Sequence, residues 1–223
     1  MAKQLPRQID ALKQQILLVG ALVEEAIAKA VSALIHRDRN MAKSVIQADD
    51  EIDRMEVDVE EEVLKILALY QPVAADLRFV VAVLKINNDL ERMGDLATNI
   101  AKRVVFLANA ERFDLPVDFR GMAARVKSMV KESLDALVNA DTLLAQRVRE
   151  SDDEVDTSRR IIEKQIEQQI AIHPERTDCL MSLSSVARHL ERIADMATNI
   201  AEDVIYMVEG EIVRHHRSSE AME

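Results

Sequence analysis

Turn-forming residues and aromatic side chains are scarce in this sequence of 223 residues. Glycine and proline occur only four times each, tryptophan is absent, and aromatic residues make up 3% of the chain. A chain with so few turn formers is expected to contain few, long elements. Alanine, leucine, glutamate, lysine, arginine and glutamine dominate instead, and all of them favour helices. The composition therefore predicts an all-α protein.

Positive charge, cysteine and long apolar runs are also in short supply. The net charge of −11 argues against a nucleic-acid partner and fits attraction for cations or basic protein surfaces. The single cysteine, Cys179, cannot form an internal disulfide, which is compatible with the cytosol. The first residues lack the apolar core of a signal peptide, and apolar runs such as 79–84 fall far short of the roughly 20 residues that span a bilayer. We expect a cytoplasmic protein without a membrane span.

Two stretches of the chain occur twice. Residues 89–101 (DLERMGDLATNIA) return 100 positions later as residues 189–201 (HLERIADMATNIA). Residues 48–53 (ADDEID) return 103 positions later as residues 151–156 (SDDEVD). Matches of this density indicate that the chain contains two versions of one unit.

Apolar residues at helical spacing predict three long helices in each unit. The predicted helices cover residues 6–36, 39–69 (with a bend near Ala48), 74–110, 117–147, 152–171 and 176–210. Short connections make neighbouring helices antiparallel, so each unit is expected to be an up-down-up three-helix bundle. The two bundles are expected to pack side by side with pseudo-two-fold symmetry.

The same reading divides the chain into three parts. Residues 1–112 are predicted to form the first three-helix repeat and residues 113–210 the second. The last helix is expected to end at Gly210, because glycine favours the position just beyond a helix. Residues 211–223 are polar and are expected to form a flexible tail.

Each unit carries two pairs of carboxylates spaced four residues apart, which places each pair on one face of a helix. The pairs are Asp49 with Asp53, Glu91 with Asp95, Asp152 with Asp156, and Glu191 with Asp195. Like charges at this spacing destabilise a helix by about 0.2–0.5 kcal/mol per pair. If the second and third helices of each unit pack together, the pairs converge into sites whose oxygen ligands suit magnesium, calcium, manganese or iron.

Two alternatives remain open for these carboxylates. They can form a solvated surface, with Arg92 and Arg192 neutralising the pairs in the repeated helix. Asp49 and Asp152 can also cap a helix or lie in a bend, although this role leaves Asp53 and Asp156 unexplained.

Motifs for catalysis are missing. No histidine follows a glutamate by three positions, which excludes the Glu-x-x-His pairs of ferritin-like di-iron proteins. The sequence also has no glycine-rich phosphate loop and no G-x-S-x-G motif. The sequence therefore does not indicate any of these catalytic classes.

The chain resembles the PhoU family, the accessory proteins of bacterial phosphate-specific transport systems, over about residues 5–210. The resemblance is carried by residues 87–95 (NNDLERMGD), 97–101 (ATNIA), 190–195 (LERIAD) and 197–202 (ATNIAE), together with the two acidic stretches. It implies a cytoplasmic negative regulator of phosphate uptake and of the phosphate-starvation response, and it implies that the protein is not an enzyme. It also implies two partners, the transporter's ATPase subunit and a phosphate-sensing histidine kinase, and a homodimer.

The resemblance further implies metal binding through the paired acidic motifs. One site would comprise Asp49, Asp53, Glu91 and Asp95, and the other Asp152, Asp156, Glu191 and Asp195. A divalent metal or an iron cluster fits both sites, and the motifs do not distinguish magnesium, manganese, iron, calcium or zinc. The sites are not identical, since Glu56 has Arg159 as its counterpart and Lys102 has Glu202. A metal-storage protein or metal-dependent enzyme, and a plain helical scaffold, remain the alternatives.

Overall fold

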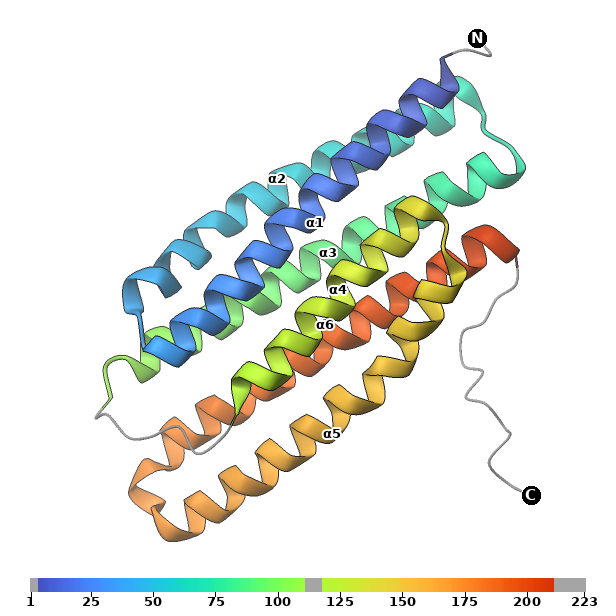
Figure 1. Cartoon of the computed structure of the whole chain (residues 1–223). Helices are drawn as coiled ribbons and strands as arrows, with labels where there is room; N and C mark the ends of the chain where they lie inside the picture. The colour runs from blue at the N-terminus through green and yellow to red at the C-terminus, as the bar shows by residue number, and fades with distance from the viewer. Residues whose placement is uncertain (1–3, 111–117, 211–223) are drawn as a thin grey trace, which may run out of the picture.

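The computed structural model describes residues 4–110 and 118–210, which form six long α-helices, one short 3₁₀ helix and no β-strand (Figure 1). The helices are α1 (Leu5–His36), α2 (Arg39–Tyr70), α3 (Ala74–Leu107), α4 (Phe119–Asn139), α5 (Thr142–Ile172) and α6 (Thr177–Glu209), with the 3₁₀ helix at Pro174–Arg176. The all-α prediction is confirmed. The predicted tail, residues 211–223, and the predicted boundary at residues 112–113 lie outside the described residues.

Local sequence signals account for several of the helix ends. Pro6 lies in the first turn of α1, where its missing N–H group needs no partner. Asp38 caps α2, because its carboxylate accepts hydrogen bonds from the backbone N–H groups of Asn40 and Met41 at 2.9 and 3.0 Å. Gly210 ends α6 with φ of 76°, as predicted from the sequence.

The predicted boundary between the fourth and fifth helices is wrong. α4 ends at Asn139 and α5 begins at Thr142, whereas the sequence predicted one helix over 117–147 and the next from 152. The chain turns at Ala140, which has φ of 51°, and Asp141 caps α5 by accepting a hydrogen bond from the Leu144 N–H at 2.9 Å. Asp152 therefore lies well inside α5, as Asp49 lies inside α2, so neither residue caps a helix.

The six helices form two antiparallel three-helix bundles that lie side by side (Figure 1). α3 and α6 lie next to each other at the centre, and α1 and α4 also pack together across the two bundles. Among the described elements, α2 packs only on α1 and α3, and α5 packs only on α4, α6 and the 3₁₀ helix, so these two helices are outermost. This arrangement agrees with the predicted pair of bundles.

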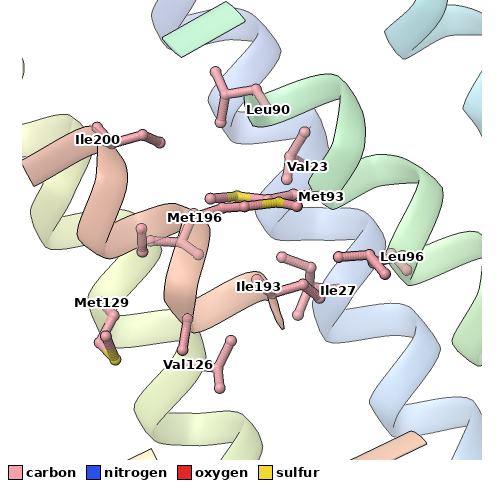
Figure 2. Close-up of a cluster of buried hydrophobic side chains, with 14 of the residues drawn as sticks. Val23, Ile27, Leu90, Met93, Leu96, Val126, Met129, Ile193, Met196 and Ile200 are labelled. Atoms are coloured by element: carbon pink, nitrogen blue, oxygen red, sulfur yellow. The ribbon is translucent and has the colours of Figure 1, made fainter. Parts of the chain in front are cut away.

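One apolar core runs through both bundles. The buried side chains of α1, α3, α4 and α6 belong to a single cluster, and the labelled members in Figure 2 point toward one another from these four helices. Met93 of α3 is fully buried and Met196 of α6 is 5% exposed near the centre of this cluster. Burial of a side chain of this size contributes about 1.5–3 kcal/mol, so the interface between the bundles stabilises the whole chain.

Gly20 explains how α1 and α4 approach each other closely. The glycine is buried, and a Cβ atom at this position would collide with the side chain of Leu134 on α4. A glycine within a helix costs about 1 kcal/mol relative to alanine. At Gly20 this cost is offset by the close packing of α1 against Leu134 of α4, which the absence of a side chain permits.

Candidate cation-binding carboxylate clusters

The packing of α2 against α3 brings together the four predicted ligands of the first unit, here called the first cluster: Asp49, Asp53, Glu91 and Asp95. Burial is the largest cause that raises the pKa of Glu91, and the negative charges of Asp95, Asp53, Glu56 and Asp49 raise it further. The pKa of Asp49 is likewise raised first by burial and then by Asp53 and Asp95. All four carboxylates therefore lie within electrostatic range of one another, as the repeat predicted.

Two residues of the repeated helix hold α2 and α3 in register at the first cluster. A Cβ atom at Gly94 would lie 3.2 Å from Ile52 Cδ1 and 3.5 Å from a carboxylate oxygen of Asp49, so glycine allows the two helices to approach closely here. Asn87 is fully buried, and its side-chain amide donates a 2.8 Å hydrogen bond to the backbone carbonyl of Glu56. No pattern in the sequence predicted that Asn87 would connect the two helices.

Thr98 adds a hydroxyl group to the first cluster. The residue is 3% exposed, and its Oγ1 atom is buried without a hydrogen bond of normal geometry. The hydroxyl nevertheless lies close enough to Asp49 to lower the pKa of that carboxyl group, as does the positive charge of Lys102. A buried hydroxyl without a well-formed hydrogen bond, next to a carboxylate, is a position where a further ligand or water satisfies the polar atom.

The packing of α5 against α6 forms the second cluster: Asp152, Asp156, Glu191 and Asp195. Burial, followed by the charges of Asp195, Asp156 and Asp153, raises the pKa of Asp152 to about 6. The pKa of Asp195 is raised by burial and then by Asp156. The four predicted ligands of the second unit are thus also brought within electrostatic range of one another.

Arg159 makes the second cluster different from the first. Its Nε atom lies 2.8 Å from Glu191 Oε1, and its Nη1 atom donates a 2.5 Å hydrogen bond to Glu163 Oε2. Burial raises the pKa of Glu191, and Arg159 is the main influence that lowers it again. At the matching place in the first cluster stands Glu56, whose own pKa is raised by burial and by neighbouring carboxylates. A guanidinium group thus neutralises part of the second cluster, whereas the first cluster contains an extra acid.

Comparisons with known proteins decide the family. The family model described as "PhoU domain" matches residues 16–104 and 119–204, one match in each bundle. The chain belongs to the PhoU family. A PhoU homologue from Aquifex aeolicus, named a phosphate-specific transport system accessory protein, is 43% identical over 96% of this chain and 97% of its own length. The homologue of that name from Pseudomonas aeruginosa is 36% identical over 96% of this chain and 89% of its own length.

Solved PhoU structures have the same fold. The crystal structure of PhoU from Pseudomonas aeruginosa superimposes with a TM-score of 0.88 at 36% identity, covering 92% of this chain and 99% of that one. A PhoU structure from Streptococcus pneumoniae, titled a phosphate transport system regulatory protein, gives a TM-score of 0.84 at 29% identity over 94% and 99%. These relatives are named accessory or regulatory proteins, which agrees with the expectation that this PhoU chain is not an enzyme.

The donor atoms of the two PhoU clusters suit a hard cation, but the side chains are not arranged as a finished metal site. Carboxylate and hydroxyl oxygens are ligands that magnesium, calcium and manganese prefer. Within residues 4–110 and 118–210, no three His, Cys, Asp or Glu side chains converge closely enough to hold a metal ion. The carboxylates repel one another, so their side chains turn apart unless a cation lies between them. Each cluster has a buried threonine hydroxyl, Thr98 beside Asp49 and Thr198 beside Asp152. The first cluster has the better fitting donor set, because no arginine forms an ion pair with its carboxylates in the described parts of the chain.

No helix in the described parts of this PhoU chain has a stretch long and apolar enough to cross a membrane.

Proposed function

We propose that this protein is a cytoplasmic accessory protein of a phosphate-specific transport system. In this role it negatively regulates phosphate uptake and the phosphate-starvation response. The observation that carries the proposal is the PhoU-domain match in both bundles, together with relatives of nearly equal length that are named accessory proteins of this transport system. Deletion of the gene is expected to raise phosphate uptake in phosphate-rich medium and to switch on starvation genes. Unchanged uptake and expression would contradict this function.

The protein would act as an adaptor between the transporter's ATPase subunit and a phosphate-sensing histidine kinase. The absence of a catalytic motif and the net charge of −11 favour a role through surface contacts with basic partner surfaces. The tagged chain should retain both partners when it is isolated from phosphate-rich cells. Failure to retain either partner at any phosphate level would refute the adaptor role.

The two carboxylate clusters would bind divalent cations or iron and so regulate the charge of the α2–α3 and α5–α6 faces. The buried Thr98 hydroxyl beside Asp49 supports this proposal for the first cluster. Protein purified without a chelator should contain metal by elemental analysis, and the double variant Glu91→Ala/Glu191→Ala should lose it. A control double variant, Asp50→Ala/Asp153→Ala, removes two exposed carboxylates next to the clusters and should keep the metal. Equal metal content in all three proteins would contradict these sites.

A metal-dependent enzyme would give a different result. Turnover in a hydrolase or ferroxidase screen that Glu91→Ala abolishes would replace the adaptor with an enzyme. If all four acidic pairs can be neutralised without changing partner binding or regulation, the chain is a plain helical scaffold.

The chain is further proposed to assemble as a homodimer, as its resemblance to PhoU proteins implies. Light scattering after size-exclusion chromatography should give about twice the 25.1 kDa mass of the chain. A monomer at micromolar concentration, with and without added cation, would contradict this proposal.

A further inference from the structure

α3 and α6 pack against each other in antiparallel orientation, and this contact is here called the seam. The residues at its two ends can be compared, because the two helices repeat one sequence. Arg78 Nε of α3 donates a 2.8 Å hydrogen bond to the backbone carbonyl of Met207 on α6, and Lys85 Nζ lies 3.2 Å from Asp203 Oδ1. Figure 1 shows the two helices side by side along their length. Because the repeated stretches are 100 positions apart, each residue at one end of the seam has a counterpart at the other end.

One end of the seam is acidic and contains its own counterion. Asp89 and Asp203 are 9% and 2% exposed there, and Lys85 forms an ion pair with Asp203. These three residues line a groove of about 530 Å³ together with Asn88, Asn199 and Glu202. Buried carboxylates are stable when a cation of the same chain lies beside them, and Lys85 supplies that cation.

The other end has the opposite charge, and its basic side chains form no ion pair within residues 4–110 and 118–210. Arg103 stands where the acidic end has Asp203, His189 stands where it has Asp89, and Ser185 replaces the neutralising Lys85. The Ser185 hydroxyl donates a 3.0 Å hydrogen bond to the backbone carbonyl of Met181 and carries no charge. Two acidic residues of the acidic end are thus basic residues at this end, and no acidic residue stands at the position equivalent to Lys85.

Three arginines lie at the same end of the seam as His189. The register that places Asp203 beside Lys85 places Arg103 near Ser185, one helical turn from His189. Arg188 and Arg192 lie on α6, one helical turn apart, and Arg103 comes from α3. None of the three forms an ion pair with another residue in the described parts of the chain, although Arg192 lowers the pKa of Asp195 from a distance.

His189 itself adds a basic side chain to this end. Its Nδ1 atom is buried without a hydrogen-bond partner. In a chain with a net charge of −11, this local excess of positive charge is unusual.

We propose that this basic end, formed by Arg103, Arg188, His189 and Arg192, binds a compact, doubly charged oxyanion such as inorganic phosphate. The anion would take the place that Lys85 has at the acidic end, as a counterion for a cluster that lacks one. Planar guanidinium groups bind tetrahedral oxyanions with paired hydrogen bonds, which a single lysine cannot form. The site borders the second cluster, since Arg192 lowers the pKa of Asp195, but its charge is of the opposite sign.

Isothermal titration of the full chain with inorganic phosphate tests the proposal. The chain is first stripped of metal with EDTA, and the chelator is removed by gel filtration because it is itself a multiply charged anion. The titration is then carried out at constant ionic strength. The native chain should bind one phosphate, and sulfate should compete while acetate should not. Arg103→Gln and Arg192→Gln should each weaken binding about tenfold or more. Arg92→Gln, which removes the counterpart of Arg192 at the acidic end, should leave the affinity unchanged.

A second variant adds charge instead of removing it. Ser185→Glu places an internal counterion beside the arginines and should abolish phosphate binding while the helical circular dichroism stays native. No saturable binding of phosphate or sulfate by the native chain would overturn the proposal. Equal weakening by Arg92→Gln and Arg192→Gln would also overturn it, as would binding of an acidic peptide without binding of phosphate.

Discussion

Replacing Asp152 by asparagine should stabilise the protein at neutral pH when no metal is present. Burial and three neighbouring carboxylates raise the pKa of this residue from 3.8 to about 6. The folded chain therefore binds this proton more tightly than the unfolded chain does. Its ionisation destabilises the fold above about pH 6 and has no effect below about pH 4. Asparagine keeps the shape of the side chain and removes the charge.

The size of the effect follows from the pKa difference. A gap of about two units corresponds to roughly 3 kcal/mol, because one unit is worth about 1.4 kcal/mol. The carboxyl group is partly exposed, and solvent screening reduces this figure to about 1–2 kcal/mol. Asp152→Asn should thus raise the free energy of unfolding by about 1–2 kcal/mol at pH 7 and by nothing measurable at pH 4.

Urea denaturation followed by circular dichroism at 222 nm, in EDTA at both pH values, measures this difference. Asp50→Asn is the matched control, because it makes the same substitution at an exposed position of α2 and should change stability little at either pH. In millimolar Mn²⁺ the advantage of Asp152→Asn should shrink, since a bound cation would stabilise the ionised native cluster. A variant that is less stable than the native chain in EDTA at pH 7, or equally changed at both pH values, would refute the reasoning.

Three further substitutions test other parts of the structure. Arg159→Gln should make the melting temperature respond more strongly to added Mn²⁺ than Arg147→Gln does, because Arg147 is an exposed arginine of α5 that forms no ion pair with the second cluster in the described parts of the chain. Equal shifts by scanning fluorimetry would show that Arg159 does not compete with cations. Gly94→Val should lower the free energy of unfolding, measured by urea denaturation, by about 1–3 kcal/mol, because even the Cβ atom of valine would lie 3.2 Å from Ile52. An unchanged free energy of unfolding would contradict the close helix contact. Asp141→Ala should cost about 1 kcal/mol by removing the cap of α5, and an unchanged denaturation midpoint would rule out that contribution.

Helix periodicity predicted most of the fold but not the turn between α4 and α5. Leu134, Leu137, Ala145 and Val148 are all buried and keep helical spacing on both sides of the turn, and neither glycine nor proline marks the break. The usable signal was Asp141, which repeats the helix cap Asp38 at the same offset of 103 that relates the acidic stretches.

The repeat also predicted which carboxylates would come together, because helix packing follows from the apolar stripe and fixes the opposite face. It did not predict how the side chains turn within each cluster. The side-chain orientations depend on counterions such as Arg159. Its contact with Glu191 joins α5 to α6, and the sequence does not show how far apart these helices lie. Nor did the sequence show that Thr98 and Thr198 would be buried without a well-formed hydrogen bond, since this depends on how closely neighbouring helices pack.

The charge reversal along the α3–α6 seam has a consequence for recognition. A backbone with internal pseudo-two-fold symmetry offers any docking partner two nearly equivalent orientations, related by half a turn. Asp203 with its partner Lys85 stands at one end of the seam and Arg103 at the equivalent place of the other, so the two ends differ in charge. An approaching charged surface is oriented by this difference in charge before contact, so one of the two orientations is favoured. A partner can therefore dock in one preferred orientation, although the two bundles have nearly the same backbone.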